Sequence, residues 1–371
     1  MAVAQHRAPE GIVTTVPAYA LQVDAARHDR GVRIRCEVPH GSVTAVVGPN
    51  GSGKSSLIKI VSGQLRPDEG TVAIDGRLVS GPGVFVPVHR RRVALLEQRP
   101  LLFEHLDVLD NVAFGPRALG VSPAEACRRA RTELQAVGCL DLASNRSWEI
   151  SGGQAQRISL ARALATDPRL VLLDEPMAAL DVSVSPAVRA LLRERIRGEG
   201  RTALMVTHDI IDALSLADTL LVIDDGGVAD LGPVEELLAR PRTPFLADLV
   251  GVNLLAGKGV GARAVVLSTG ERVAGMTDGP VPEGVTALAS FEPSAVAVHL
   301  DEPTGSPRNH LRAQVVGMEP RGTLVRLTAA LGDGTEVAAD LTVAAAVEQD
   351  LHPGRDVWLA VKAVQVSLYP R

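Results

Sequence analysis

The stretch that decides the fold is a glycine-rich loop with one lysine, Gly48-Pro49-Asn50-Gly51-Ser52-Gly53-Lys54-Ser55, followed directly by Ser56. It fits the spacing G-x-x-x-x-G-K-[ST], in which glycines let backbone N–H groups converge on phosphate oxygens and the lysine adds a point charge. The apolar run 43–47 precedes the loop and a helix-compatible segment follows, so that a helix N-terminus would face the anion. A glycine-rich turn before a helix is the simpler alternative. Lysine occurs only at four positions in the chain, Lys54, Lys59, Lys258 and Lys362, and this scarcity favours a nucleotide phosphate loop in which Ser55 offers a hydroxyl to Mg²⁺.

Strand-like apolar runs alternate with helix-length segments from residue 1 to about 240. The runs cover residues 42–47, 92–96, 170–173, 202–206 and 219–223. This alternation predicts a parallel sheet covered by helices. Ser122 before Pro123 is typical of a helix start, and Gly138 is typical of the end of that helix. The interval 99–165 is mostly helical and lies between two core strands, which predicts an inserted helical subdomain.

The character of the sequence changes after residue 240. Residues 241–254 contain prolines and mixed polarity, and we interpret them as a linker. From residue 255 to 371, short valine-rich runs are interrupted by Gly, Pro and Asp, which predicts a small all-β domain of the OB-like kind. No repeat with a solenoid period is evident. The expected fold class is an α/β P-loop NTPase cassette (1–240) with a helical subdomain, followed by a small all-β domain.

Composition argues against several classes of protein. The 371 residues carry a formal net charge of −5, which disfavours a protein whose main partner is nucleic acid. The apolar runs are strand-sized, well below the roughly 18 residues that cross a bilayer, and residues 1–11 lack the apolar core of a secretory signal. The three cysteines form no Cys-x-x-Cys pattern, so neither a disulfide framework nor a zinc site is predicted. We expect residence in the cytoplasm.

Two carboxylates, Asp174 and Glu175, follow the apolar run 170–173. In a phosphoryl-transfer site the first carboxylate would hold Mg²⁺ and the second would act on the attacking water. A strand that simply ends in an acidic turn is common, so this pair alone is weak evidence. The phosphate loop upstream favours the catalytic interpretation.

Between the loop and these carboxylates lies the sequence Ser151-Gly152-Gly153-Gln154, and here the chain resembles the ABC ATPase family. In that family the corresponding serine and glycine contact the γ-phosphate bound by the other copy of a head-to-tail dimer. Standing alone, the same residues would be an ordinary helix N-cap. Ile150 occupies the position where the family usually has leucine.

The resemblance extends to three further motifs in family order: Gln98 matches the Q-loop glutamine, Asp181 the D-loop aspartate and His208 the switch histidine. It implies a homodimer that encloses two Mg-ATP. Glu175, His208 and Gln98 would be the catalytic residues, and the Mg²⁺ ligands would be Ser55, Gln98 and Asp174.

One departure from the family concerns adenine. Relatives commonly place an aromatic ring on the base from a position upstream of the phosphate loop, whereas residues 25–30 contain no aromatic side chain. Arg27 or His28 is expected to stack instead, through a guanidinium or imidazole plane. Such a contact predicts weak discrimination between bases.

The absence of a membrane-spanning run is typical of an importer subunit that docks on separate integral membrane permease subunits, at the cytoplasmic face of the plasma membrane. Residues 98–115 resemble the surface that receives a permease helix in importers. A substrate-binding protein, periplasmic or extracellular, would take part indirectly. A soluble regulatory ABC ATPase is the alternative from another class.

The C-terminal region resembles the Mop/TOBE-like domain of molybdate importer ATPases. The resemblance lies in residues 306–313, 351–354 and 361–363. It implies molybdate as cargo and a possible oxyanion site, with the donors Ser306, Arg308, Asn309 and Lys362. Related importers for sulfate, iron, polyamines or sugars carry similar domains and remain alternatives.

Overall fold

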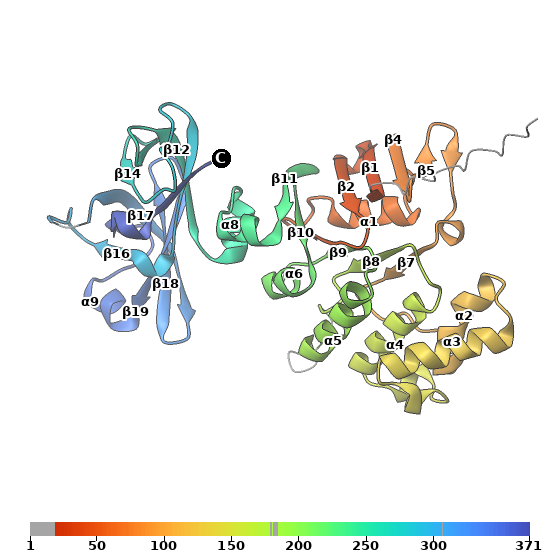
Figure 1. Ribbon diagram of the computed structural model, residues 1–371. Helices are drawn as coiled ribbons and strands as arrows, with labels where there is room; N and C mark the ends of the chain where they lie inside the picture. Colours follow the sequence, from red (N-terminus) through yellow and green to blue (C-terminus); the bar gives the residue numbers. More distant parts are fainter. Residues whose placement is uncertain (1–18, 179, 181–184, 306) are drawn as a thin grey trace, which may run out of the picture.

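The computed structural model describes residues 19–178, 180, 185–305 and 307–371 (Figure 1). A cassette of mixed helices and strands lies at one end, and a domain built mainly of strands lies at the other, with α8 between them. Asp181 and Ser306, both predicted to be functional, fall outside the described residues.

The central sheet of the cassette has six strands in the order β11-β10-β3-β9-β8-β7. Five of them run parallel, and β11 (Gly227–Pro233) closes one edge in the antiparallel direction. The parallel strands are β3 (Val43–Val47), β7 (Val93–Leu96), β8 (Leu170–Asp174), β9 (Ala203–Val206) and β10 (Thr219–Asp224). Every residue of β3 is buried, as expected for a parallel strand covered on both faces. The predicted parallel sheet is confirmed.

A second, antiparallel sheet covers one face of the first. Its order is β2 (Val32–Pro39), β1 (Tyr19–Arg27), β4 (Glu69–Ile74), β5 (Arg77–Gly81) and β6 (Val84–Phe85). Helix α1 (Lys54–Ser62) is packed in the same apolar cluster as strands of both sheets, through Leu57, Ile60 and Val61. Burial on both sides fixes the direction of α1 and therefore the position of the phosphate loop at its start.

The inserted helical subdomain is confirmed by α2 (Val108–Ala118), α3 (Pro123–Ala136) and α4 (Gly152–Leu164), which share one apolar core. The Ser122 hydroxyl accepts a bond from the Glu125 N–H, so the expected N-cap of α3 is present. Helices α5 (Ser185–Leu192), α6 (Ile210–Leu216) and α7 (Val234–Ala239) contribute to the core on the other face of the parallel sheet.

The interval 241–254, which we interpreted as a linker, contains helix α8 (Pro244–Val250). Thr243 caps this helix and Pro244 opens it, so the proline that suggests a linker is a helix-start residue. Leu246 belongs to the apolar core of the cassette. The cassette therefore continues to about residue 250, and the β domain begins with β12 at Asn253.

The C-terminal domain consists of two five-stranded sheets that share one core, where a single small barrel was expected. One sheet has the order β14 (Arg272–Ala274), β13 (Ala264–Leu267), β12 (Asn253–Gly259), β15 (Thr286–Phe291), β21 (Ser367–Pro370). The other has the order β16 (Val296–His299), β20 (Asp356–Val361), β17 (Asn309–Arg321), β18 (Leu324–Leu331), β19 (Glu336–Thr342). One short helix, α9 (Val343–Glu348), follows β19. The all-β character of this domain is confirmed.

The two sheets exchange strands. β16 directly follows β15 in the chain but pairs with β20, whereas β21 follows β20 but pairs with β15. Two asparagine side chains make equivalent contacts from each half to the other. Asn253 bonds both backbone groups of Ala338, and Asn309 bonds both backbone groups of Ala274. The domain is thus a tandem of two similar halves. This repeat has no solenoid period in the sequence, because its signal is a few spaced residues.

Candidate nucleotide site

The phosphate loop joins β3 to α1, and positive φ angles and close contacts favour its glycines. Gly48, Gly51 and Gly53 have φ angles of 154°, 81° and 110°. A Cβ on Gly48 would lie 1.9 Å from the Ile223 carbonyl oxygen, and one on Gly53 would lie 2.9 Å from a Val32 methyl group. Only glycine fits these two positions without displacing the loop.

Lys54 is buried at the start of α1, with 8% of its surface exposed. Its Nζ donates to the carbonyl oxygens of Gly48 at 2.8 Å and Pro49 at 2.7 Å. Burial lowers the pKa of Lys54, and the charges of Glu175 and Asp174 act in the opposite direction. The nearby Ser52 hydroxyl is buried without a hydrogen-bond partner. A desolvated cation beside an unpaired hydroxyl fits a polyanionic ligand such as a nucleoside triphosphate.

A cavity of about 330 Å³ lies against the loop and is lined by Arg30, Gly51, Gly53, Lys54, Ser55 and Ser56. Arg30 belongs to the turn between β1 and β2, the region where we expected Arg27 or His28 to stack on adenine.

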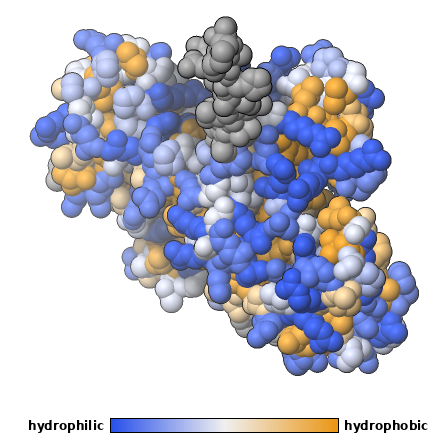
Figure 2. Space-filling model, turned by 45° about the vertical axis from the view of Figure 1, so that its right-hand side comes forward, coloured by the Kyte–Doolittle hydropathy of each residue, from blue (hydrophilic) through white to orange (hydrophobic). Residues whose placement is uncertain are grey.

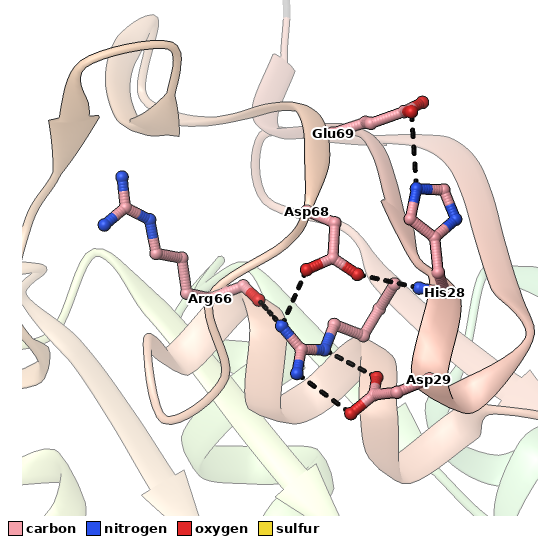
Figure 3. Close-up of polar contacts among 6 residues, drawn as sticks. His28, Asp29, Arg66, Asp68 and Glu69 are labelled. Carbon is pink, nitrogen blue, oxygen red and sulfur yellow. Dashed lines mark hydrogen bonds and ion pairs between the residues drawn. The ribbon is translucent and has the colours of Figure 1, made fainter.

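The Arg27 guanidinium is fixed by its own contacts (Figure 3). Its Nε and Nη2 donate to Asp29, and its Nη1 donates to Asp68 at 2.8 Å and to the Arg66 carbonyl at 3.2 Å. His28 Nε2 lies 3.3 Å from Glu69 Oε1. Of the basic residues at 27–30, Arg30 is the one that lines the phosphate cavity.

The two predicted carboxylates lie at the end of β8. Burial raises the pKa of Asp174, with the Glu175 charge as the next cause. Glu175 has a φ of 47°, in the left-handed region, and its N–H donates to the Val206 carbonyl at 3.0 Å. His208 follows β9, and its Nδ1 lies 3.6 Å from Glu175 Oε2. The structure thus brings Lys54, Asp174, Glu175 and His208 into one site.

A buried network that the sequence analysis missed supports the His208 segment. Asp212 on α6 is 3% exposed and accepts bonds from Arg189 on α5 and from the Thr207 hydroxyl. Burial raises the pKa of Asp212 in spite of the Arg189 contact, so the carboxylate is strongly desolvated. No local motif marks these residues, because they meet only in the folded chain.

The signature residues Ser151–Gln154 form the start of α4. The Ser151 hydroxyl accepts from the Gln154 N–H at 3.3 Å, and the Gln154 side chain accepts from the Ser151 N–H at 2.8 Å. No atom lies within 4 Å of a Cβ built on Gly152. None of the four residues lines the phosphate cavity within this chain. The Ser151 and Gln154 N–H groups are bonded to each other's side chains, whereas the first-turn N–H groups of Gly152 and Gly153 are left for a ligand held elsewhere.

Gln156 on α4 is a second residue that the sequence analysis missed. It is buried, and its Nε2 donates to the Pro176 carbonyl at 2.8 Å. This bond ties the signature helix to the turn that follows Glu175. Gln98, by contrast, is exposed just after β7.

Not all of the predicted oxyanion donors are free to bind a ligand. The Asn309 amide is 1% exposed, and both its polar atoms bond the Ala274 backbone, which removes it as a free donor. Arg308 and Lys362 are exposed, and they flank the paired residues Asn309 and Val361 of neighbouring strands. The two residues therefore lie opposite each other just beyond one end of the β17–β20 ladder.

An aromatic patch, defined here as Leu101, Phe103, Phe114 and Leu119, lies on the helical subdomain. The rings of Phe103 and Phe114 are 4.7 Å apart, and the Arg162 guanidinium lies 5.4 Å from the Phe103 ring centre. Leu101, Phe114 and Leu119 are exposed. Apolar patches of this kind stand out on a mostly hydrophilic surface in Figure 2.

This site defines a P-loop ATPase: a phosphate loop lies between a parallel strand and a helix buried on both sides, and it faces an Asp–Glu pair. The helical insertion, with its helix that starts at Ser-Gly-Gly-Gln, is the feature of ABC cassettes among these ATPases. Family models agree: the model described as ABC transporter matches residues 32–178, and that described as TOBE domain matches residues 305–368. The chain belongs to the ATP-binding subunits of ABC transporters, which are ATPases.

Relatives match over nearly the whole chain. The molybdenum import ATP-binding protein ModC of Mycobacterium tuberculosis H37Rv is 40% identical over 94% of this chain and 97% of its own length. The molybdate/tungstate import ATP-binding protein WtpC of Pyrococcus horikoshii is 31% identical over 91% of this chain and 95% of its own. The spermidine/putrescine import protein PotA of Frankia alni is 34% identical over 88% of this chain and 72% of its own.

Among solved structures, cbiO1 from Clostridium perfringens, part of the ABC transporter complex cbiONQ, matches with a TM-score of 0.55 and 28% identity. The match covers 60% of this chain and 92% of that one. Import ATP-binding subunits of this family work with membrane permease components and associate with the membrane peripherally. In the described part of this chain, no helix is both long and apolar enough to span a bilayer.

Proposed function

We propose that this chain energises the uptake of molybdate, working as a homodimer on permease subunits at the cytoplasmic face of the plasma membrane. The observation that carries this proposal is the 40% identity to a molybdenum import protein, which runs through both domains and 97% of that protein. The polyamine relative is matched over only 72% of its length.

Within one copy, the chemistry rests on positioning and charge. The loop N–H groups, the α1 N-terminus and Lys54 bind the triphosphate, and Lys54 exchanges its bonds to Gly48 and Pro49 for phosphate oxygens. Glu175 orients and polarises the attacking water. His208, whose Nδ1 lies 3.6 Å from Glu175 Oε2, bonds the γ-phosphate.

The donors proposed for Mg²⁺ fit that ion. Ser55, Gln98 and Asp174 offer a hydroxyl, an amide and a carboxylate oxygen, which are the hard ligands Mg²⁺ prefers. Across the described ranges, no group of three or more His, Cys, Asp or Glu residues is arranged to hold a metal, so the proposal depends on mixed donors and nucleotide phosphates. Bound there, Mg²⁺ would neutralise charge developing on the phosphate oxygens.

The signature residues complete the site of the other copy. Ser151 and Gly153 lie at the start of the 13-residue helix α4, whose N–H groups and dipole suit a γ-phosphate. Asp181, outside the described residues, remains a proposed dimer contact. Closure with ATP and reopening after hydrolysis would alternate, and the aromatic patch would pass this motion to a permease helix.

The C-terminal domain is proposed to bind an oxyanion between two copies. Arg308 and Lys362 supply the charge, since two cations held at one end of a ladder repel each other unless an anion lies between them. Ser306, outside the described residues, remains a candidate donor.

Reconstitution with the permease tests the cargo. Liposomes holding the full complex are supplied with binding protein loaded with molybdate, tungstate or sulfate, or with spermidine or Fe(3+). We expect ATP hydrolysis to rise with molybdate and tungstate alone. Stimulation by sulfate, spermidine or Fe(3+) instead would assign another cargo. If the chain hydrolyses ATP but never co-sediments with the permease, a soluble regulatory role replaces the importer.

A further inference from the structure

The phosphate cavity has no aromatic wall. Its lining consists of Arg30 and small or polar residues of the loop and α1. Residues 25–30 contain no aromatic side chain, nor do residues 1–18. A nucleobase bound beside Arg30 therefore has a guanidinium on one side and nothing from the lining residues to cover its other face.

Trp148, by contrast, is a large aromatic side chain that is mostly exposed. Its exposed fraction is 71%, although tryptophan is highly buried on average. It lies three residues before Ser151, the first signature residue. Elsewhere in the described chain, Tyr369 and Phe291 are buried, and the exposed rings of Phe85 and Phe114, at 37% and 46%, are more covered than that of Trp148.

The backbone around Trp148 is fixed. Trp148 lies in the single 3₁₀ turn Ser147–Glu149, whose ends are closed by a bond from the Arg146 N–H to Glu149 Oε2 at 2.6 Å. Arg146 Nη1 also donates to the His105 carbonyl at 2.7 Å. Since Ser151 is fixed by its own bonds to Gln154, the Trp148 Cα is held at most about 10 Å along the chain from the signature serine.

We infer that Trp148 of one copy stacks on the adenine bound by the other copy, while Arg30 of that other copy contacts the opposite face of the base. The inference rests on the proposed function, because only a head-to-tail dimer places a signature segment over a phosphate cavity. With Ser151 at the γ-phosphate, a reach of about 10 Å is comparable with the ribose-triphosphate part of ATP. Indole and guanidinium planes both stack on purines.

Two properties follow when Trp148 and Arg30 hold the base from opposite faces. Stacking tolerates any base because every base has a π face, so ATP and GTP should bind with similar affinity. The base also gains its second contact only when the dimer forms. Nucleotide affinity and dimerisation are therefore linked through Trp148 as well as through the γ-phosphate.

Fluorescence of the full-length chain tests the inference. Trp358→Phe leaves Trp148 as the only tryptophan, since the chain has two, and Glu175→Gln prevents turnover. Mg-ATP, Mg-GTP and Mg-tripolyphosphate are titrated while sedimentation follows dimer formation. We expect the Trp148 emission to change with ATP and GTP in step with dimerisation, and to stay constant with tripolyphosphate. A dimer that forms with ATP while the emission is unchanged overturns the inference but leaves the proposed function intact. If no ATP-dependent dimer forms, the proposed function itself fails.

Kinetics of the isolated chain give a second readout. Trp148→Ala should raise KM for ATP about 10-fold or more, whereas Trp148→Phe should keep most of the affinity. Val347→Ala on α9 is the matched control, because Val347 is an apolar residue with 74% of its surface exposed in the other domain. If Trp148→Ala leaves KM unchanged and lowers only transport by the complex, Trp148 is a permease contact and the inference is wrong.

Discussion

Glu175 combines a chemical role with a strained backbone. A non-glycine residue in the left-handed region costs about 1–2 kcal/mol, and here the bond from the Glu175 N–H to the Val206 carbonyl holds that conformation. Strain at this position fixes the direction of a carboxylate that must meet a water molecule at the γ-phosphate.

Glu175→Gln should bind ATP with nearly unchanged affinity and hydrolyse it roughly 10²- to 10⁴-fold more slowly, because the shape survives while the base is lost. Single-turnover hydrolysis and sedimentation with Mg-ATP check both parts, and the stalled dimer should accumulate. Near-normal turnover of this variant would remove Glu175 from the role of base.

Asp174→Asn should separate stability from activity. The folded protein raises the pKa of Asp174, mainly through burial and then through the Glu175 charge, so folding disfavours the ionised form. This penalty is fully present above the folded pKa and disappears below the unfolded value of 3.8. The variant should therefore have a higher Tm than the wild type at pH 7.5, without nucleotide, and should lose hydrolysis.

Thermal melts from pH 7.5 down toward pH 4 check the sign for Asp174→Asn. The gain in Tm should shrink as the wild-type carboxylate takes up its proton. A gain that grows toward low pH, or a loss of Tm at pH 7.5, would contradict the assigned cause.

At the scale of elements, the site depends on contacts between helices that no local pattern encodes. The phosphate loop, Asp174, Glu175 and His208 could be predicted because each lies in a motif next to a buried strand. Gln156 and Asp212 could not, since Gln156 bonds a carbonyl from another element and Asp212 bonds a side chain from another helix. Arg30 was missed for the same reason, because only the folded turn shows which arginine lines the cavity.

Arg189→Ala should destabilise the cassette by about 3–5 kcal/mol, since it leaves the buried Asp212 carboxylate without its cation. Urea unfolding measures the change. The control is Arg128→Ala, which breaks an exposed ion pair to Glu125 and should cost no more than about 0.5 kcal/mol. Equal small losses for the two variants would show that Asp212 is neutral or solvated in the native state.

The Arg189→Ala substitution should also slow hydrolysis, because the Thr207 hydroxyl bonds Asp212 at 3.2 Å and directly precedes His208. Assays at a temperature where the variant remains folded separate this effect from loss of stability. Unchanged turnover would limit the network to a structural role.

At the scale of the whole molecule, the order of domains and the parallel sheet were predictable from apolar runs. The antiparallel sheet was not, since β6 has two residues and β4 is largely exposed at its start. The predicted linker 241–254 differs from the structure at α8, because Pro244 is typical both of a linker and of a first helical turn.

The aromatic patch gives a prediction for the assembled transporter. Phe114→Asp places a charge on the apolar surface proposed to receive the permease. Hydrolysis by the isolated chain should stay within about twofold of the wild type, because Phe114 is exposed and does not line the phosphate cavity. Transport and co-sedimentation with the permease should fall at least about 10-fold. Leu231→Asp, an exposed apolar residue on the edge strand β11, is the matched control. Equal losses from both variants would point to general instability and away from docking.

The exchange of β16 and β21 between the two sheets has a consequence for how the C-terminal domain can be divided. Because each half lends its last strand to the other, neither half encloses a complete core of its own. The domain should melt in one transition, and a cut in the connection between β16 and β17 should leave two fragments that are unstable apart yet reassemble when mixed. The exchange also limits how far the two halves can diverge in sequence. A substitution in β16 or β21 must fit the sheet of the other half, so the two halves are expected to change together.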